Sequence, residues 1–319
     1  MNVRTYIAKR MLQIFPVLLG VVVINFVIIH IAPGNPAVIM AGGEAPPEYI
    51  RMLEEEWGLN KPLHEQFVTY LTNLLRGNLG YSYKYRAPVL DVILERLPAT
   101  LLLTGTAFLM AVLAGVVLGV SSSRKPFSFE DNMIMLGSLV FYSMPNFWTG
   151  LMAIIVFSLR LGLFPVQGIQ FFRVDLNSTL DLIWHLILPA TTLGLVQLAL
   201  YARLTRSSML EELRKDYITT ARSKGLDDRS ILYRHALKNA LIPTITIIGI
   251  RLSFMFTGAV VTETIFAWPG IGRLMYDSIY TRDYPLLMGI FIISSAVTVL
   301  ANFLADIAYC VVDPRIRYE

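Results

Sequence analysis

An apolar run near the start of the chain limits what the chain can fold into. Between residues 11 and 32 only Gln13, Asn25 and His30 are polar. A helix over this run would be about 33 Å long, which is enough to cross the hydrocarbon core of a bilayer. Basic residues precede the run, but it is longer than the apolar part of a signal peptide and no A-x-A cleavage site follows it. We therefore expect an uncleaved transmembrane anchor.

Further apolar runs are also long enough to cross a bilayer, and they cover residues 98–120, 133–159, 182–202, 240–262 and 285–312. The composition agrees, because 55% of the residues are hydrophobic, 16% are charged and the mean hydropathy is +0.58. The single cysteine, Cys310, excludes a disulfide within the chain, and its place near the end of a span favours a buried, inert thiol. The sequence thus predicts an all-α integral membrane fold with six transmembrane helices.

An even number of spans places both termini on the same side of the membrane. If that side is the cytoplasm, the inner segments hold 16 Lys and Arg residues and the outer segments hold 10. The loop 203–238 alone holds nine of them. Because cytoplasmic loops are enriched in Lys and Arg, we expect cytoplasmic termini and a cytoplasmic basic loop.

The longest outer segment, residues 33–97, is expected to be structured. Its pattern predicts a helix from Pro47 to Trp57 that stops at Gly58, and a second helix that Asn60 caps and Gly77 ends. The second helix would carry one apolar stripe, formed by Leu63, Phe67, Tyr70, Leu71, Leu74 and Leu75. About 65 residues bury too little apolar surface for a robust core, so the insert should lean on membrane helices or on another subunit. It is either a platform for an extracytoplasmic partner or a structural cap.

Helix breakers interrupt several predicted spans, at Pro16, Pro145, Pro189 and Gly258. The backbone groups that such breakers release must be satisfied by neighbouring helices or by a water-lined cavity. The breaks therefore indicate either a translocation path or packing kinks. No internal repeat relates the first three spans to the last three, which weighs against an inverted-repeat secondary transporter.

Motifs for catalysis are missing from the sequence. None of the 21 glycines is followed by lysine, so the chain has no Walker A loop for nucleotide phosphates. His64-Glu65 starts like a zinc-protease motif, but Val68 stands where the second histidine is required. The four histidines lie in different segments, which argues against a metal site. We therefore expect a chain that is not an enzyme.

Two charged residues fall inside predicted spans, Arg251 near the middle of its span and Asp306 closer to the cytoplasmic end. A charge in hydrocarbon is costly, so each should face the bundle interior or a wet cavity. Arg251 would either contact an anionic group of a substrate or form a structural ion pair with Asp306. Both interpretations remain open.

The charged stretch from Asp216 to Pro243 lies between two predicted spans. Its first part should form a short helix, Asp216 to Lys224, which Gly225 stops by adopting a positive φ. Asp227 or Asp228 can cap the helix that follows. Such a pair of half-helices at the membrane surface suits docking to a soluble partner.

This stretch resembles the EAA loop of ABC importer permeases, in which Glu-Ala-Ala is followed by three residues and Gly. Thr219, Thr220, Ala221 and Gly225 occupy those places. Stretches over essentially residues 1–319 resemble the dipeptide, oligopeptide and nickel branch, closest to the first of its two paralogous dipeptide permease subunits. They are KRMLQIFPVLLG, HIAPGNP, LGYS, ERLPATLLL, SMPNFWTG, TARSKGL, RHALKNALIP, TETIFAWPGIGRL and DPRIR.

The resemblance implies an importer in the prokaryotic cytoplasmic (inner) membrane. Its partners would be a second permease subunit, two cytoplasmic ATPase subunits and an extracytoplasmic substrate-binding protein. This chain would hold no cofactor, and ATP and Mg would bind to the ATPase subunits. The helix would couple to the ATPase through Asp216, Tyr217, Thr219, Thr220, Ala221, Arg222, Lys224 and Gly225. Ala221 is small enough to let this helix sit in a groove of the partner.

The implied organisation has four parts: the N-terminus and first span (1–32), the extracytoplasmic insert (33–97), a five-helix core with the coupling loop 203–239 (98–312), and a cytoplasmic tail (313–319). Candidate pathway residues are Asn146, Arg251, Glu263 and Asp306. The cargo is expected to be a dipeptide or oligopeptide, with nickel or an oligosaccharide as the alternative. An ion-coupled secondary transporter that works alone is the alternative from a different class.

Overall fold

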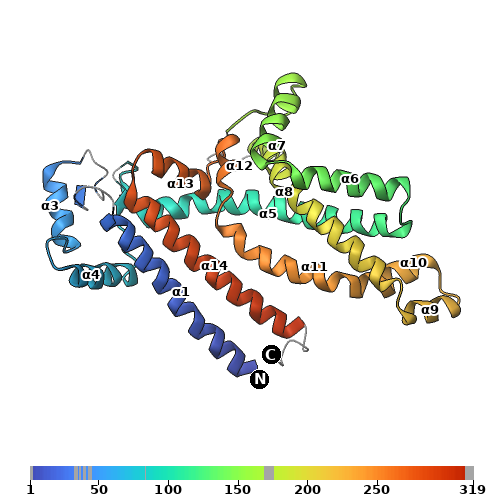
Figure 1. The fold of residues 1–319 in the computed structure, drawn as a ribbon. Helices are drawn as coiled ribbons and strands as arrows, with labels where there is room; N and C mark the ends of the chain where they lie inside the picture. Colours follow the sequence, from blue (N-terminus) through green and yellow to red (C-terminus); the bar gives the residue numbers. More distant parts are fainter. Residues whose placement is uncertain are drawn as a thin grey trace. The chain divides into compact units, whose positions relative to one another are not determined.

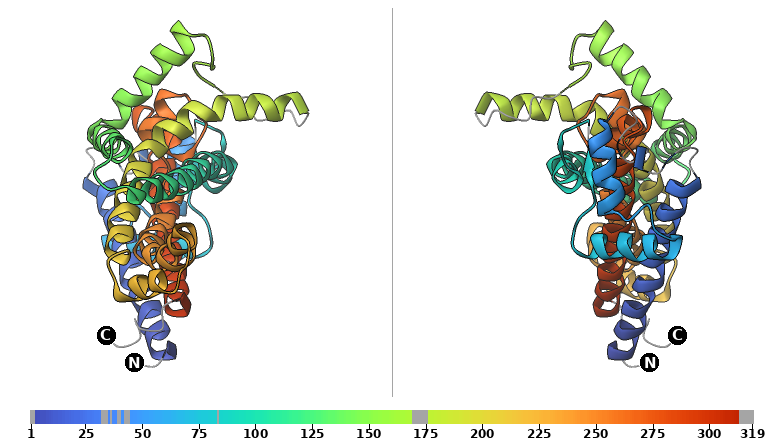
Figure 2. Two further views of the ribbon diagram at one scale, coloured as in Figure 1. Left: turned by 90° about the vertical axis from the view of Figure 1, so that its right-hand side faces the viewer. Right: turned by 90° about the vertical axis from the view of Figure 1, so that its left-hand side faces the viewer.

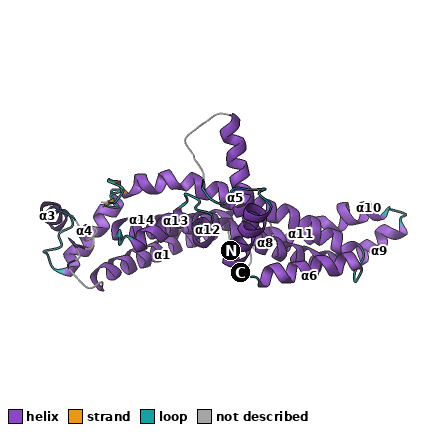
Figure 3. Ribbon diagram, turned by 90° about the horizontal axis from the view of Figure 1, so that it is seen from above, coloured by secondary structure: helices purple, strands orange, loops and turns teal. Residues whose placement is uncertain are grey.

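The computed structural model describes residues 3–31, 35, 37–38, 41, 45–82, 84–168 and 176–312. Helix dominates the described chain, and strand occurs in it as one short antiparallel pair, β1 (Tyr81–Ser82) with β2 (Ala87–Pro88) (Figure 3). The chain forms two compact units. The first comprises residues 1–101, 253–260 and 269–319, and the second comprises residues 102–252 and 261–268.

The first unit is built on two long apolar helices that pack side by side, α1 and α14 (Figure 1). Its elements are α1 (Val3–Ile31), α3 (Pro47–Glu56), α4 (Leu63–Leu75), the start of α5 (Val89–Arg124), the 3-10 turn η3 (Ser253–Phe256), α13 (Ile271–Tyr280) and α14 (Tyr284–Val312). Apolar side chains of α5, α13 and α14 form one buried cluster that includes Val89, Ile93, Leu274, Leu286 and Ile290. This cluster stabilises the unit through close packing of apolar side chains.

The insert contains the two expected helices, with one difference. The helix α3 ends where Gly58 takes a φ of +61°, and α4 ends before Gly77, whose φ is +79°. The predicted cap is wrong: α4 starts after Pro62, which occupies the N-cap position, and no side chain caps it. Proline has no side-chain acceptor, and the Pro62 carbonyl oxygen accepts from the backbone N–H of Glu65 at 2.9 Å instead.

The insert leans on the membrane helices, as expected. Trp57 and Tyr70 lie in a buried cluster against Val22 and Phe26 of α1 and Ile292 of α14. A segment of this size buries little apolar surface by itself, so these contacts extend its core.

The predicted apolar stripe of α4 is only partly correct. Leu63 and Leu75 are exposed, and the polar Gln66 is buried. Gln66 Oε1 lies 2.8 Å from His30 Nε2, at hydrogen-bond distance. Gln66 Nε2 donates to the carbonyl oxygens of Leu59 and Lys61. Because these partners satisfy the amide, it can replace an apolar residue in the core.

The second unit is organised around α8 (Leu176–Glu212). The helices α6, α7 and α11 all pack against it. Its other elements are the end of α5, α6 (Phe129–Ser143), α7 (Asn146–Ala153), the π-helix η1 (Ile154–Arg160), α9 (Asp216–Ser223), α10 (Asp228–Ser230), the π-helix η2 (Ile231–Ala236), α11 (Leu237–Leu252) and most of α12 (Val260–Ile265).

Two glycines let α5 and α8 approach closely. A Cβ on Gly115 would lie 2.7 Å from the Cβ of Tyr201, and one on Gly119 would lie 2.6 Å from the carbonyl oxygen of Ala202. Glycines four residues apart present a flat strip on one helix face, which brings membrane helices into backbone contact. The sequence reasoning missed this Gly-x-x-x-Gly pattern.

Four described helices are long and apolar enough to cross a membrane, and the count rises to five if one bent pair is a single span. That pair covers the predicted span 133–159: α6 and the α7–η1 segment meet at 106°, and Pro145 is the N-cap of α7. The bend between the two green segments can be followed in Figure 2. The predicted span 240–262 is also not one helix. Here α11 ends at Leu252, and Gly258 takes a φ of +81°. The count of six spans stays a prediction.

The other two expected interruptions are wrong. Pro16 lies inside the continuous helix α1, and Pro189 lies inside the continuous helix α8. A proline in a membrane helix is tolerated where neighbouring groups satisfy the released carbonyl. Close to Pro189, the Thr191 hydroxyl donates to the carbonyl oxygens of Ile187 and Leu188, whereas the carbonyl released by the proline is that of His185.

Candidate functional site

The loop between α8 and α11 contains the short helix that the sequence predicts. The helix α9 runs from Asp216 to Ser223, and Lys224 is its C-cap. Gly225 follows with a φ of +80°, a conformation that glycine adopts without steric cost. The next helix, α10, is capped by Asp227, whose carboxylate accepts a bond of 3.1 Å from the backbone N–H of Ser230. Of the two predicted cap residues, the structure therefore selects Asp227.

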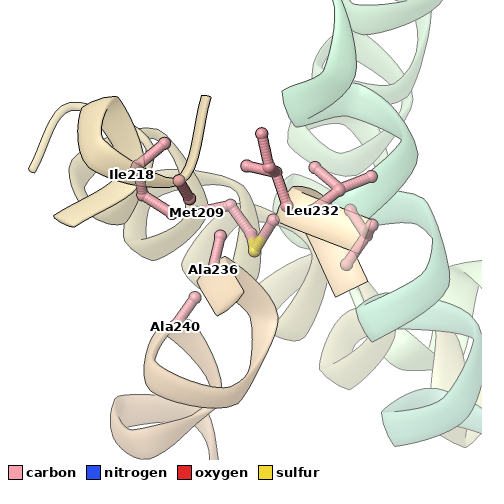
Figure 4. Close-up of a cluster of buried hydrophobic side chains, with 8 residues drawn as sticks. Met209, Ile218, Leu232, Ala236 and Ala240 are labelled. Carbon is pink, nitrogen blue, oxygen red and sulfur yellow. The ribbon is translucent and has the colours of Figure 1, made fainter. Parts of the chain in front are cut away.

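One face of α9 is anchored in the core of its own unit. Ile218 and Ala221 are buried in a cluster that combines α5, α8, α9, η2 and α11. The cluster consists of Val120, Met209, Ile218, Ala221, Ile231, Leu232, Ala236 and Ala240 (Figure 4). Movement of α9 would therefore have to move the ends of α5 and α8 as well.

The expected role of Ala221 needs correction. Its side chain is 6% exposed and faces the chain's own core, so its small size serves packing within the chain. The expected reason for a small residue at this position is therefore wrong, while docking of α9 in a groove of a partner stays a prediction. Ala221 faces inward because α9 is amphipathic, and its apolar residues three apart take the inward face.

A polar clamp holds the start of α9. The Tyr217 hydroxyl donates to Glu212 Oε2 at 2.7 Å and accepts from Asn239 Nδ2 at 3.1 Å. Lys215 Nζ donates to Glu212 Oε1 at 2.5 Å. Burial, and then the bond to Glu212, raise the pKa of Tyr217 further above its ordinary range, and the protonated hydroxyl is the donor to Glu212. The clamp ties α9 to the end of α8 and to the start of α11.

The outward face of α9 is polar and exposed. It carries the predicted coupling residues Asp216, Thr219, Thr220, Arg222 and Lys224. The Thr220 hydroxyl donates to the carbonyl oxygen of Asp216 at 3.0 Å, which satisfies it within the helix. The two cations lie at the C-terminal end of α9, where the helix dipole favours positive charge. The face can thus bind a partner that carries complementary charge.

The candidate pathway residues lie on four separate elements. Asn146 starts α7, and its buried Oδ1 atom has no hydrogen-bond partner in the described part of the chain. Glu263 is fully buried in α12. The backbone of Asp306 belongs to α14, but its side chain lies outside the described residues. Their role in a pathway stays a prediction.

Arg251 differs from its expected position. It lies in the last turn of α11 and is exposed, instead of lying in the middle of a continuous span. The 3-10 turn Ser253–Phe256 and the positive φ of Gly258 break the helix directly after it. A charged side chain at a helix end can reach polar surroundings more easily than one in mid-span.

Glu212 is the residue of this site that the sequence reasoning missed. It is 9% exposed, and it joins Lys215 and Tyr217 across the break between α8 and α9. Lys215 and Tyr217 follow Glu212 by three and five residues. This spacing does not place all three on one helix face, because the chain turns between α8 and α9. An acidic residue that precedes Lys and Tyr at a helix break is the pattern that would have pointed to it.

Comparison with known proteins identifies the family. Residues 111–318 match the family described as binding-protein-dependent transport system inner membrane component. The chain belongs to this family. The N-terminal part of the permease, residues 3–104, matches the N-terminal family of the same transport systems.

The permease has relatives of nearly equal length. It is 41% identical over 314 residues to the oligopeptide transport system permease protein AppB of Bacillus subtilis, with 98% of this chain and 99% of the relative covered. Over 330 residues it is 40% identical to the dipeptide transport system permease protein DppB of Alkalihalophilus pseudofirmus, and over 336 residues it is 38% identical to DppB of Escherichia coli K12. Coverage is again 98% of this chain and 99% of each relative. The resemblance to dipeptide and oligopeptide permeases is confirmed, and the permease is a transport component and not an enzyme. Assignment of α9 to an EAA loop stays a prediction.

Proposed function

We propose that the permease is one membrane subunit of an ATP-driven importer that carries dipeptides or oligopeptides across the cytoplasmic membrane. Relatives with about 40% identity are named as dipeptide and oligopeptide permeases. The observation that carries the proposal is the construction of α9. Its apolar face is fixed in the core through Ile218, and its polar face is exposed next to Gly225.

In this proposal an ATPase subunit binds the outward face of α9. A displacement of α9 is transmitted through Ile218 to Met209 on α8 and to Val120 on α5. The close contact of α5 with α8 at Gly115 and Gly119 makes these helices move together. ATP binding and hydrolysis would thus switch the membrane helices between outward-open and inward-open states as a rigid lever.

The complete importer would contain this chain, a second paralogous permease, two ATPase subunits with ATP and Mg, and an extracytoplasmic binding protein. Six spans and cytoplasmic termini belong to this proposal. The nine Lys and Arg residues of the loop 203–238 support a cytoplasmic location of α9. The insert, residues 33–97, would then face the binding protein or the second permease.

Two alternatives differ in what they predict. The same machine could carry nickel or an oligosaccharide, which a competition assay would detect. A secondary transporter would move its cargo without any other chain and would depend on an ion gradient.

The test uses the tagged full-length permease, purified gently from its native membrane. We expect a second permease and an ATPase to copurify with it. Proteoliposomes of this complex with its binding protein should take up a labelled dipeptide only when ATP reaches the ATPase side. Excess unlabelled dipeptide should abolish the uptake, whereas nickel or a trisaccharide should not. Uptake by the purified single chain without ATP would refute the proposal.

A further inference from the structure

A basic pocket of about 530 Å³ opens beside α9. Four cationic side chains line it: Arg124 and Lys125 at the end of α5, Arg222 from α9 and Arg229 from α10. The remaining lining comes from Leu213, Asp228, Ile231, Leu232 and Tyr233. The pocket therefore combines an apolar part with a strongly cationic rim.

The positive charge of this pocket is not neutralised within the described residues. The side chains of Arg124, Lys125, Arg222 and Arg229 form no ion pair there, and Asp228 is the one carboxylate of the lining. Guanidinium groups bind phosphate oxygens through pairs of parallel N–H donors, and an ammonium adds a point charge. The pocket thus has the chemistry of a phosphate site.

Two aromatic side chains next to this pocket indicate its depth relative to the membrane. Phe127 and Phe129 follow the basic pair and are 81% and 80% exposed. The backbone N–H of Phe127 donates to Asp131 Oδ2 at 2.7 Å, which fixes the backbone of the turn between α5 and α6. Exposed Phe rings beside Lys and Arg are typical of segments that insert apolar side chains into a membrane surface.

We propose that this pocket binds the phosphate of an anionic phospholipid headgroup. Phe127 and Phe129 would lie among the upper acyl chains of that leaflet, and Arg124, Lys125 and Arg229 would surround the phosphate. The apolar part of the pocket would receive the glycerol backbone. A bound lipid would link α10 to the end of α5, because Arg229 belongs to one element and Arg124 to the other.

The experiment compares lipid retention by the full-length permease in its assembled transporter. The complex is placed in nanodiscs that contain phosphatidylglycerol and phosphatidylcholine in equal amounts, then extracted with mild detergent and analysed by native mass spectrometry. The pocket variant is Arg124→Gln with Arg229→Gln. The matched control is Arg214→Gln with Arg234→Gln, which removes two exposed charges from the same loop outside the pocket.

We expect the native chain and the control to retain phosphatidylglycerol, and the pocket variant to retain about tenfold less, because it loses two charge-assisted interactions. Equal retention by the pocket variant, or equal loss in the control, would overturn the proposal. A second arm adds inorganic phosphate at millimolar concentration before extraction. The lipid should remain bound, and displacement by phosphate would show a site for soluble phosphate instead. Lipid retention is measured without transport, so the proposed cargo does not affect this result.

Discussion

Arg206 donates two hydrogen bonds to Asp131, from Nε to Oδ1 and from Nη2 to Oδ2, each 2.6 Å long. The pair joins α8 to α6 within the second unit. The same carboxylate also accepts from the Ser122 hydroxyl of α5 and from the backbone N–H of Phe127. One buried carboxylate thus fixes three helices and the turn between two of them.

Arg206→Gln should lower the melting temperature of the purified permease markedly. The change leaves the carboxylate of Asp131, which is 1% exposed, without its counter-ion, and breaking a buried pair costs about 3 kcal/mol. Thermal unfolding in mild detergent measures the effect. Arg214→Gln, which removes an exposed charge, is the control and should change little. Equal melting temperatures for the two variants would show that the pair does not stabilise the fold.

Gly119→Ala should destabilise the permease, whereas Gly137→Ala should not. A Cβ at Gly119 would lie 2.6 Å from the Ala202 carbonyl oxygen, so α5 and α8 must separate at a cost of about 1–3 kcal/mol. Gly137 lies inside α6 with nothing within 4 Å of its Cβ position, and alanine there gains about 1 kcal/mol of helix propensity. Folded yield and melting temperature of both variants check this. Equal effects would contradict the close contact of the two helices.

Tryptophan substitutions at Ala221 and Thr220, two neighbouring residues of α9, should have different effects on the stability of the permease and on its binding to the ATPase. Ala221→Trp should lower the stability of the permease, because the ring overfills the buried cluster around Ile218 and Met209 at a cost of about 1–3 kcal/mol. Thr220→Trp should leave stability unchanged, since Thr220 is exposed, but should weaken binding of the ATPase. Melting temperature and copurification of the ATPase are the two measurements. If Thr220→Trp binds the ATPase normally, α9 is not the docking helix.

Substitution of Gly225 should affect coupling more than folding. A Cβ there would meet nothing within 4 Å, so the cost arises from the φ of +80°, at about 1–2 kcal/mol for a β-branched residue. Gly225→Val should shift the end of α9 and lower the number of peptides imported per ATP hydrolysed. Gly225→Asn tolerates this backbone better and should retain more coupling. Identical ratios in both variants and the native chain would refute the proposed lever.

Asp283 should make stability depend on pH. Burial, as the largest cause, raises the pKa of this carboxyl, although the Ser82 hydroxyl and the backbone N–H of Leu286 donate to it. A raised pKa in the folded state means that stability is highest below the ordinary pKa of aspartate and is lost as pH rises through the folded value. Asp283→Asn removes this loss of stability. The melting temperature of the variant minus that of the native permease should therefore increase as pH rises. An advantage that is constant or falls with rising pH would contradict the expectation.

Local sequence was sufficient to predict several helix ends. The positive φ of Gly58, Gly77 and Gly225 follows from the position of each glycine after an amphipathic stretch. The cap by Asp227 has the same local origin. Such features depend on residues within one or two turns, so an apolar run and its flanking glycines or prolines contain the necessary information. The long apolar helices α1 and α14 were predictable for the same reason.

Contacts between distant segments could not be read from the sequence. Asp131 and Arg206 are 75 residues apart, and no sequence pattern near either residue predicts that they pair. The inward face of Ala221, the bend of 106° around Pro145 and the helix end at Leu252 likewise depend on which helices pack together. Packing and burial are decided by the whole fold, because a side chain's surroundings come from elements far away in the chain. The sequence predicted α9 as a surface helix. The tertiary structure shows that its apolar face is anchored in the core and that its polar face is exposed.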